Sequence, residues 1–387
     1  MISATQGSEV QTGHQAMIHD AQLDFYSRRL ATCSSDRTIK VFAVSDEGNQ
    51  YLCDLQGHDS PVWGVQWAHP RFGNLIASCG YDGQVLVHRE HAQNQWSVIY
   101  QYKHETSVNS AMWAPHEYGL ILAAGSSDGN VSVHYYQPDN TWSVQTFFVT
   151  QLGVLSVSWA EATSVGAKTE DGKDVLRIVT GSCDNTAKIW KCEYGQSEWE
   201  NEFALKQHTG WVRDVAWRPS ITTKTNVLAS CSQDGTVVIW TQEKAGEEWT
   251  STLLNKFSSP VWRVSWSITG HILGVANGDN ETSLWKYSLE KKWEEIAEMP
   301  GEEEESTASE IIAEKDTAGT SSAASMAADE GVVKNEESGE TASVPPAPQV
   351  QQNDMQGGYT QQQEYAEQQL PSYGQYNQQY SHQQQGY

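Results

Sequence analysis

An aspartate recurs along the chain at intervals of 45 to 56 residues. It occupies a turn-like stretch each time, at Asp36, Asp82, Asp128, Asp184, Asp234 and Asp279. Six residues after each aspartate stands Phe42, His88, His134, Trp190, Trp240 or Trp285, and this offset does not vary. Repeats of this length are typical of propellers and solenoids, in which one supersecondary unit is used many times. The chain is therefore expected to contain six copies of one unit.

Each repeat is predicted to be four short β-strands. In the second repeat the segments VWGVQW, NLIASCG, QVLVHRE and WSVIYQY are separated by Asp, Gly and Asn turns, and no segment of the chain shows convincing helical periodicity. One four-stranded sheet with two apolar faces is unstable alone, whereas six sheets in a radial array bury each face against a neighbour. The predicted fold class is all-β, a six-bladed WD-repeat β-propeller.

The distribution of aromatic residues divides the chain. All 16 Trp and all seven Phe lie at or before Trp293, and the sequence beyond residue 298 is acidic and then rich in Gln and Tyr. Such a segment buries too little apolar surface to fold. The expected parts are an N-terminal segment (1–13), the propeller (14–298) and a disordered tail (299–387), whose tyrosines are a hypothesis for weak self-association. An insertion in repeat four (161–174) is expected to be an exposed loop.

Charge and motif content exclude several function classes. The net charge is −25, and no Lys/Arg run exceeds two residues, which argues against direct nucleic-acid binding. No secretory or membrane-spanning segment is recognisable. No phosphate-binding glycine loop or CxxC pair occurs. The histidine pairs His88/His91 and His14/His19 have no further partners at the spacing of metal ligands. We therefore expect free thiols and no metal or cofactor.

Repeat five holds a complete set of hydrogen-bonding residues, His208, Ser230, Asp234 and Trp240, and repeat two holds His58, Ser78 and Asp82. A Ser-His-Asp catalytic triad is the alternative interpretation. Catalysis needs one exposed nucleophile, however, whereas this set recurs around the ring. The residues are therefore interpreted as a structural WD network, and the protein is not expected to be an enzyme.

Two features concern the closure and surface of the ring. Repeat six already has its own fourth strand, KKWEEIAEM, and the first 13 residues are too polar to predict another, so the ring is expected to lack a covalent latch. Trp63 and Trp262 share strand parity with core residues and are predicted to fill seams between blades. Arg213 is the better surface candidate.

Several long runs resemble the Sec thirteen family, among them MIHDAQLDFYSRRLATCSSDRTIKVF, GHDSPVWGVQWAHPRFGNLIASCGYDG and VWRVSWSITGHILGVANGDNETSLWK. The resemblance extends over residues 14–298. It implies an open six-bladed propeller whose missing blade comes from an α-solenoid partner. It also implies scaffold roles in the outer COPII vesicle coat, in the Y-shaped complex of the nuclear pore and in a nutrient-signalling assembly at the lysosome.

The implied mechanism is β-augmentation, in which partner strands pair between the first and sixth blades. The expected edge segments are 16–24 and 258–287. The expected partner-binding residues are Met17, Ile18, Asp20, Val261, Arg263 and Leu284. The implied assembly is a hetero-oligomer held peripherally at the cytoplasmic face of the endoplasmic reticulum. The alternatives are a sister propeller confined to nuclear pore and nutrient-signalling complexes, a substrate-recognition propeller and a propeller enzyme.

Overall fold

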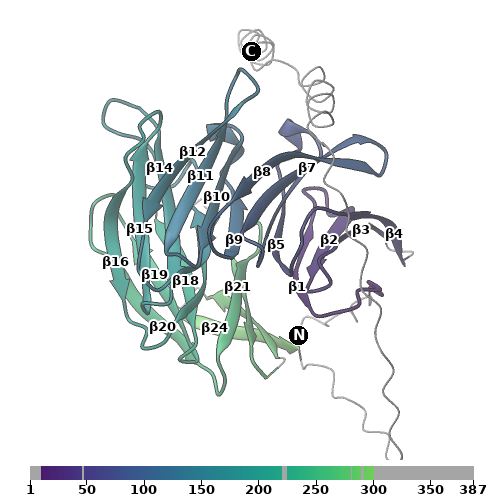
Figure 1. Ribbon diagram of the computed structural model, residues 1–387. Coiled ribbons are helices and arrows are strands. Elements are labelled where there is room, and N and C mark those ends of the chain that lie inside the picture. The colour runs from purple at the N-terminus through teal and green to yellow at the C-terminus, as the bar shows by residue number, and fades with distance from the viewer. Residues whose placement is uncertain (1–9, 46–47, 220–224, 280, 289–291, 300–387) are drawn as a thin grey trace, which may run out of the picture. The chain divides into compact units, whose positions relative to one another are not determined.

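The computed structural model describes residues 10–45, 48–219, 225–279, 281–288 and 292–299. Within these ranges, twenty-four strands form six antiparallel four-stranded sheets, each built from four consecutive strands (Figure 1). The prediction of an all-β, six-bladed WD-repeat propeller is confirmed. The expected tail, apart from Met299, lies outside the described residues.

Blades one to three follow the chain in order. Blade one comprises β1 (Ile18–Leu23), β2 (Arg29–Ser34), β3 (Ile39–Ser45) and β4 (Gly48–Leu55). Blade two comprises β5 (Val62–Trp67), β6 (Leu75–Gly80), β7 (Gln84–Ala92) and β8 (Gln95–Lys103). Blade three comprises β9 (Val108–Trp113), β10 (Ile121–Ser126), β11 (Asn130–Tyr136) and β12 (Trp142–Phe148). Two 3₁₀ turns, η1 (Pro70–Phe72) and η2 (His116–Tyr118), lie between first and second strands.

Blades four to six repeat this arrangement. Blade four comprises β13 (Val154–Trp159), β14 (Val175–Ser182), β15 (Thr186–Glu193) and β16 (Glu200–Lys206). Blade five comprises β17 (Val212–Trp217), β18 (Asn226–Ser232), β19 (Thr236–Gln242) and β20 (Thr250–Lys256). Blade six comprises β21 (Val261–Trp266), β22 (Ile272–Asn277), β23 (Thr282–Tyr287) and β24 (Trp293–Met299).

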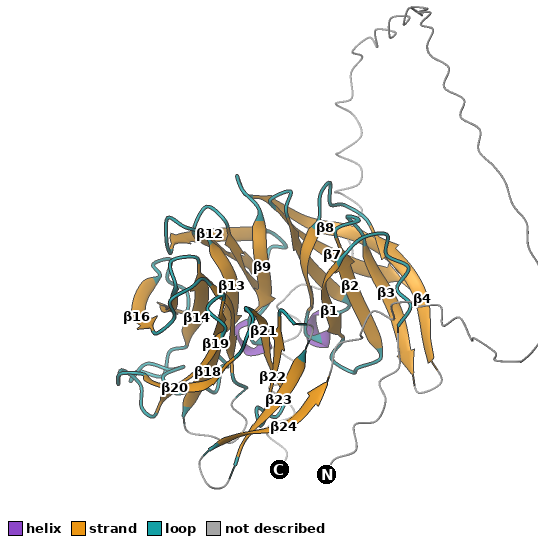
Figure 2. Cartoon of the chain, turned by 90° about the horizontal axis from the view of Figure 1, so that it is seen from below, coloured by secondary structure: helices purple, strands orange, loops and turns teal. Residues whose placement is uncertain are grey.

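Five buried hydrophobic clusters hold the blades together, and each contains residues of two successive blades. In the cluster between blades one and two, for example, Val41 and Leu55 of blade one pack with Val65 and Ile76 of blade two. The five clusters join each pair of successive blades, from blades one and two to blades five and six. The sixth sheet lies next to the first (Figure 2), yet no such cluster joins these two in the described part of the chain.

The insertion in blade four is a loop, as predicted, but it is only partly exposed. Thr163, Lys168 and the tip at residues 170–173 are exposed, whereas Ser164 and Ala167 are buried. Val165 exchanges backbone hydrogen bonds with the side chain of Asn226 in β18, at 3.0 and 2.9 Å. Arg177 of β14 also donates to the Val165 carbonyl, at 2.6 Å. The polar composition predicted exposure, but the backbone of Val165 bonds to the neighbouring blade and draws part of the loop onto it.

Candidate functional site

The predicted polar network of repeat five is assembled inside blade five. His208 Nε2 lies 2.7 Å from Ser230 Oγ, and the Trp240 indole N–H donates to the same oxygen at 2.9 Å. Asp234 accepts from the Thr236 backbone N–H at 2.9 Å. His208 Nδ1 lies 2.9 Å from Thr236 Oγ1 but 3.6 Å from Asp234, so the threonine hydroxyl lies between histidine and aspartate. One buried network thus ties the blade's entry loop to two strands and a turn.

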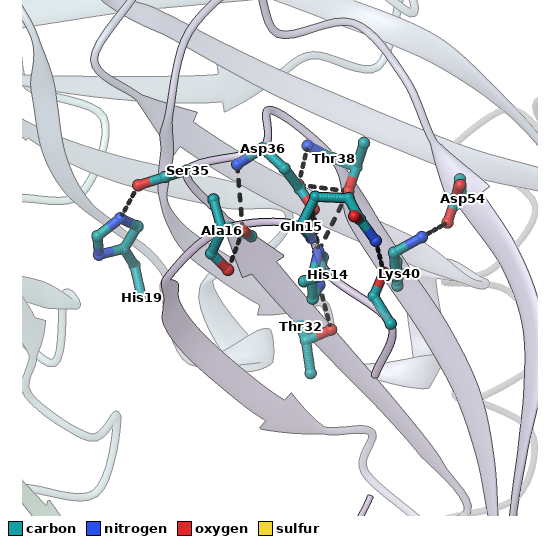
Figure 3. Close-up of polar contacts among 12 residues, drawn as sticks. His14, Gln15, Ala16, His19, Thr32, Ser35, Asp36, Thr38, Lys40 and Asp54 are labelled. Atoms are coloured by element: carbon teal, nitrogen blue, oxygen red, sulfur yellow. Dashed lines mark hydrogen bonds and ion pairs between the residues drawn. The ribbon is translucent and has the colours of Figure 1, made fainter. Parts of the chain in front are cut away.

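Blade two has the same network with a direct contact between histidine and aspartate. His58 Nδ1 lies 3.0 Å from Asp82 Oδ2, and its Nε2 lies 2.9 Å from Ser78 Oγ. Blade one repeats it, with His14 at 2.8 Å from Asp36 and 2.9 Å from Thr32 (Figure 3). Three blades therefore place these residue types in the same relative positions.

Hydrogen bonding keeps the turn aspartates ionised. Burial acts to raise the pKa of Asp82, but the bonds from His58 and from backbone N–H groups outweigh it and lower the pKa to about 2. The pKa of Asp234 is likewise lowered to about 2, against the effect of burial, chiefly by its bond from Thr236. Burial lowers the pKa of His208, although Asp234 opposes this effect. These ionised carboxylates therefore stabilise their turns at neutral pH.

This network is unsuited to nucleophilic catalysis. Ser230 and Ser78 are completely buried, and the Ser230 hydroxyl already contacts both His208 and Trp240. A nucleophile needs an open approach and an oxyanion site beside it. The geometry therefore matches a structural network rather than a catalytic triad.

Blades three and four contain variants that the sequence interpretation missed. In blade three, His104 Nε2 lies 2.9 Å from Ser132 Oγ, which in turn lies 2.9 Å from His134 Nε2. The serine is on β11 rather than β10, so the repeat alignment did not reveal it. In blade four, Lys188 takes the place of the histidine and donates to Asp184 at 2.7 Å. The sequence signal for this variant was a lysine four positions after the turn aspartate.

The innermost strands of successive blades are joined by two recurring hydrogen bonds. In the first bond, the backbone N–H of the fourth residue of an innermost strand is the donor. The acceptor is a side-chain oxygen of the third residue of the innermost strand in the preceding blade. The pairs are Val65 with Asp20 (3.2 Å), Val157 with Ser110 (3.3 Å), Val215 with Ser156 (3.3 Å) and Val264 with Asp214 (3.0 Å).

In the second bond, the indole N–H of the sixth residue of an innermost strand is the donor. The acceptor is the backbone carbonyl of the fifth residue of the innermost strand in the preceding blade. The pairs are Trp67 with Gln22 (3.0 Å), Trp113 with Gln66 (3.1 Å), Trp159 with Met112 (2.9 Å) and Trp266 with Ala216 (3.1 Å). Every junction from blade one to blade six has at least one of the two bonds. Between β21 and β1 the described residues form no hydrogen bond.

One face of the sixth sheet also lacks a close neighbour among the residues that the structure describes. Five residues after the turn aspartate, the side chain is at most 2% exposed in Val41, Val87, Val133, Ile189 and Ile239. The equivalent Leu284 is only half-buried. Every residue of β6, β10 and β18 is buried, whereas β22 alternates between half-buried and buried residues. The face that in other blades packs on the next sheet is thus partly open in blade six.

Comparison with known proteins places this propeller in a family. A protein of Arabidopsis thaliana, described as "Protein transport protein SEC13 homolog A", is 56% identical over 293 residues, which cover 74% of this chain and 97% of that protein. The chain belongs to the SEC13 family. A second SEC13-family relative, "Protein SEC13 homolog" of Dictyostelium discoideum, is 53% identical over 75% of this chain and 97% of its own length. "Protein transport protein SEC13" of Chaetomium thermophilum is 55% identical over 76% and 98%.

Two general family models also match the SEC13-family chain. The model "WD domain, G-beta repeat" matches residues 7–42 and 199–241. The model "Anaphase-promoting complex subunit 4 WD40 domain" matches residues 65–162. The predicted Sec thirteen resemblance and the predicted WD repeats are both confirmed.

The residues predicted to bind a partner occupy different environments in this SEC13-family propeller. Met17, which directly precedes β1, is 72% exposed, and Ile18, the first residue of β1, is 42% exposed. Asp20 is half-buried and accepts the bond from Val65, and Leu284 lies on the partly open face of blade six. Arg263 lines a central cavity of about 600 Å³, together with Asp20 and Asp214.

Two expectations about first strands need correction, and the cause is the same for both. Val261 is completely buried in the cluster joining blades five and six, so only its backbone is left for a partner. Trp262 is 46% exposed and Trp63 half-buried, and neither belongs to a seam cluster. Each still contacts the preceding blade, because the Trp63 ring centroid lies 4.4 Å from that of His19 and the Trp262 ring centroid lies 4.6 Å from the Arg213 guanidinium. A β-bulge after the first residue of β5 and of β21 shifts the alternation, so strict parity fails at the second residue.

The exposed tryptophans of the SEC13-family chain hold its surface arginine. The Arg213 guanidinium lies 5.0 Å from the ring centroid of Trp211 and 4.6 Å from that of Trp262. Arg213 is half-buried between them and bonds to Gln233 at 2.7 Å. Arg213 is therefore partly accessible, but its guanidinium already contacts Trp211, Trp262 and Gln233.

The described ranges of the chain contain no group of three or more His, Cys, Asp or Glu side chains able to hold a metal ion. All six cysteines are free thiols. No helix in those ranges is both long and apolar enough to span a bilayer. The buried histidines bond within the protein instead: His88 Nε2 lies 3.0 Å from the Gln56 carbonyl.

Proposed function

We propose that this SEC13-family chain is a structural scaffold subunit of the outer COPII vesicle coat, which acts in protein transport from the endoplasmic reticulum to the Golgi. Two relatives bear the words "protein transport" in their names. The family resemblance extends the proposal to the scaffold of the nuclear pore. The protein would act without catalysis, as one component of a hetero-oligomer.

The proposed mechanism is insertion of strands from an α-solenoid partner between blade six and blade one. The observation that carries it is the contrast between the junctions: five have shared cores and hydrogen bonds, and the last has neither among the described residues. A free strand edge and a partly open apolar face suit β-augmentation, because main-chain bonds supply affinity and side-chain pockets supply specificity. Ile18 and Leu284 would contact the inserted strands.

The proposed location follows from the assembly rather than from any signal in the chain. We place the protein at the cytoplasmic face of the endoplasmic reticulum and on COPII vesicles, held peripherally by its partners, and at the nuclear pore. A lysosomal nutrient-signalling assembly is a further proposed site. The proposed propeller domain extends from residue 14 to 298, and the acidic, Gln/Tyr-rich tail after it is proposed to be disordered.

Affinity isolation of the tagged full chain tests this function. Wild-type protein should recover α-solenoid subunits of the coat and of the pore. Ile18→Asp and Leu284→Asp should lose them, because a carboxylate cannot be buried against inserted strands without a large cost. Phe148→Asp is the matched control, since Phe148 is 55% exposed on β12 of blade three. Failure of wild type to recover any solenoid subunit would refute the scaffold proposal, and full recovery by both edge variants would refute the docking site.

A further inference from the structure

The two recurring hydrogen bonds between blades show which residue types join successive blades. In four of the five junctions the third position of the innermost strand offers a side-chain acceptor, namely Asp20, Ser110, Ser156 or Asp214. In four of the five the sixth position of the following blade donates an indole N–H, from Trp67, Trp113, Trp159 or Trp266. Each of the five junctions has at least one of the two bonds.

The third position of β21 is Arg263. A guanidinium has five N–H donors and no acceptor, so it cannot accept a bond from the backbone N–H of Ala21, the fourth residue of β1. That N–H lies 3.0 Å from Oδ1 of its own neighbour, Asp20. Arg263 shares the central cavity with Asp20 and Asp214. Burial acts to lower the pKa of Arg263, but the negative charges of Asp214 and Asp20 outweigh burial and raise it. At this junction a donor therefore stands where four other junctions have an acceptor.

The sixth position of β1 is Leu23, which has no polar side-chain atom. It cannot donate to the backbone carbonyl of Ser265, the fifth residue of β21. Leu23 is 46% exposed, whereas the equivalent Trp67, Trp113, Trp159 and Trp217 are 3–9% exposed. Ser265 has a hydroxyl at a position where Ser158 accepts from the backbone N–H of Trp217 at 3.0 Å. Among the residues described here, Ser265 makes no such bond to blade one.

We propose that Arg263 and Leu23 determine that blade six accepts foreign strands instead of closing on blade one. Each removes one of the two bonds by which the other blades join. The junction is therefore open because of its residue types, and not only because a fourth strand is already present in blade six. This inference rests on the proposed partner-accepting gap and names the residues that preserve it.

The test installs the missing groups in the full chain. Arg263→Ser supplies the hydroxyl found at Ser110 and Ser156, and Leu23→Trp supplies the indole. Amide hydrogen exchange of segments 16–24 and 261–268 in the isolated chain should slow by roughly tenfold, the effect of about one net hydrogen bond. Recovery of the coat α-solenoid subunit, co-expressed with the chain, should fall by a similar factor. The matched control is Arg263→Lys with Leu23→Ile, which restores neither group and should behave as wild type.

Each outcome decides one proposal separately. Unchanged exchange in the double variant would overturn the inference, and so would slowed exchange with undiminished recovery of the partner. If removal of Arg263 beside Asp214 prevents folding, the single variant Leu23→Trp should still slow exchange in segment 16–24, and no slowing there would overturn the inference. If wild type recovers no solenoid subunit, the proposed function fails, while the exchange comparison still shows whether these residues keep the junction open.

Discussion

Leu284 and Ile239 occupy the same repeat position, so truncating each to alanine measures how well each blade face is covered. Ile239 is 2% exposed within the cluster joining blades five and six. Its truncation removes three carbon groups, which costs about 2 kcal/mol in transfer free energy alone. The enclosed cavity left behind raises the expected cost to about 3–4 kcal/mol. Leu284 is half-buried on the partly open face, where water can fill the space.

We therefore expect Leu284→Ala to cost only about 1 kcal/mol in the isolated chain, because part of its surface is already hydrated. Urea denaturation of both variants and wild type, followed by tryptophan fluorescence, gives the two changes in the free energy of unfolding. The predicted difference between the variants is about 2–3 kcal/mol, which is well resolved by this assay. Equal losses for Leu284→Ala and Ile239→Ala would refute the reasoning, because they would mean that blade six is covered without a partner.

Three other measurements test the polar network, the buried histidines and the extent of the domain. Asp234→Ala should lower the free energy of unfolding by about 1–3 kcal/mol because buried donors lose their acceptor. Asp279→Ala should cost much less, since Asp279 is on the surface and accepts from Ser258. Burial lowers the folded-state pKa of His88 from 6.5 to about 4, so the stability it contributes above pH 6.5 is lost as the pH falls toward 4. His88→Phe should therefore lose less stability than wild type between pH 7 and pH 4.5, and parallel pH profiles would contradict this. Deleting residues 300–387 should leave the Tm unchanged, because all five clusters lie before residue 300, and a lowered Tm would contradict the proposed domain limit.

Features that depend on spacing within one repeat were predictable from sequence. The fixed offset from Asp234 to Trp240 identified the blade unit, and the recurrence of His, Ser and Asp identified its polar network. These contacts form within a single sheet, so each repeat contains all the information needed. Six copies of the same pattern then determine a ring of six blades.

Features that depend on register or on a neighbouring blade were not predictable in this way. The bulge in β21 buries Val261 and exposes Trp262, and simple alternation cannot locate a bulge. Lys188 replaces a histidine, and Ser132 comes from a different strand, because several residue types can satisfy the same acceptor. Whether Leu284 is covered depends on the sheet of blade one, which begins and ends more than 200 residues earlier in the sequence, and no local pattern describes that contact.

The central claim is that strands of a partner fill the space between the sheet of β21–β24 and that of β1–β4. The most direct test is an experimental structure of the assembly isolated with the tagged full chain. The account predicts partner strands paired at this junction and in contact with Ile18 and Leu284. A structure in which β21 bonds directly to β1, with the partner attached elsewhere on the propeller, would contradict it.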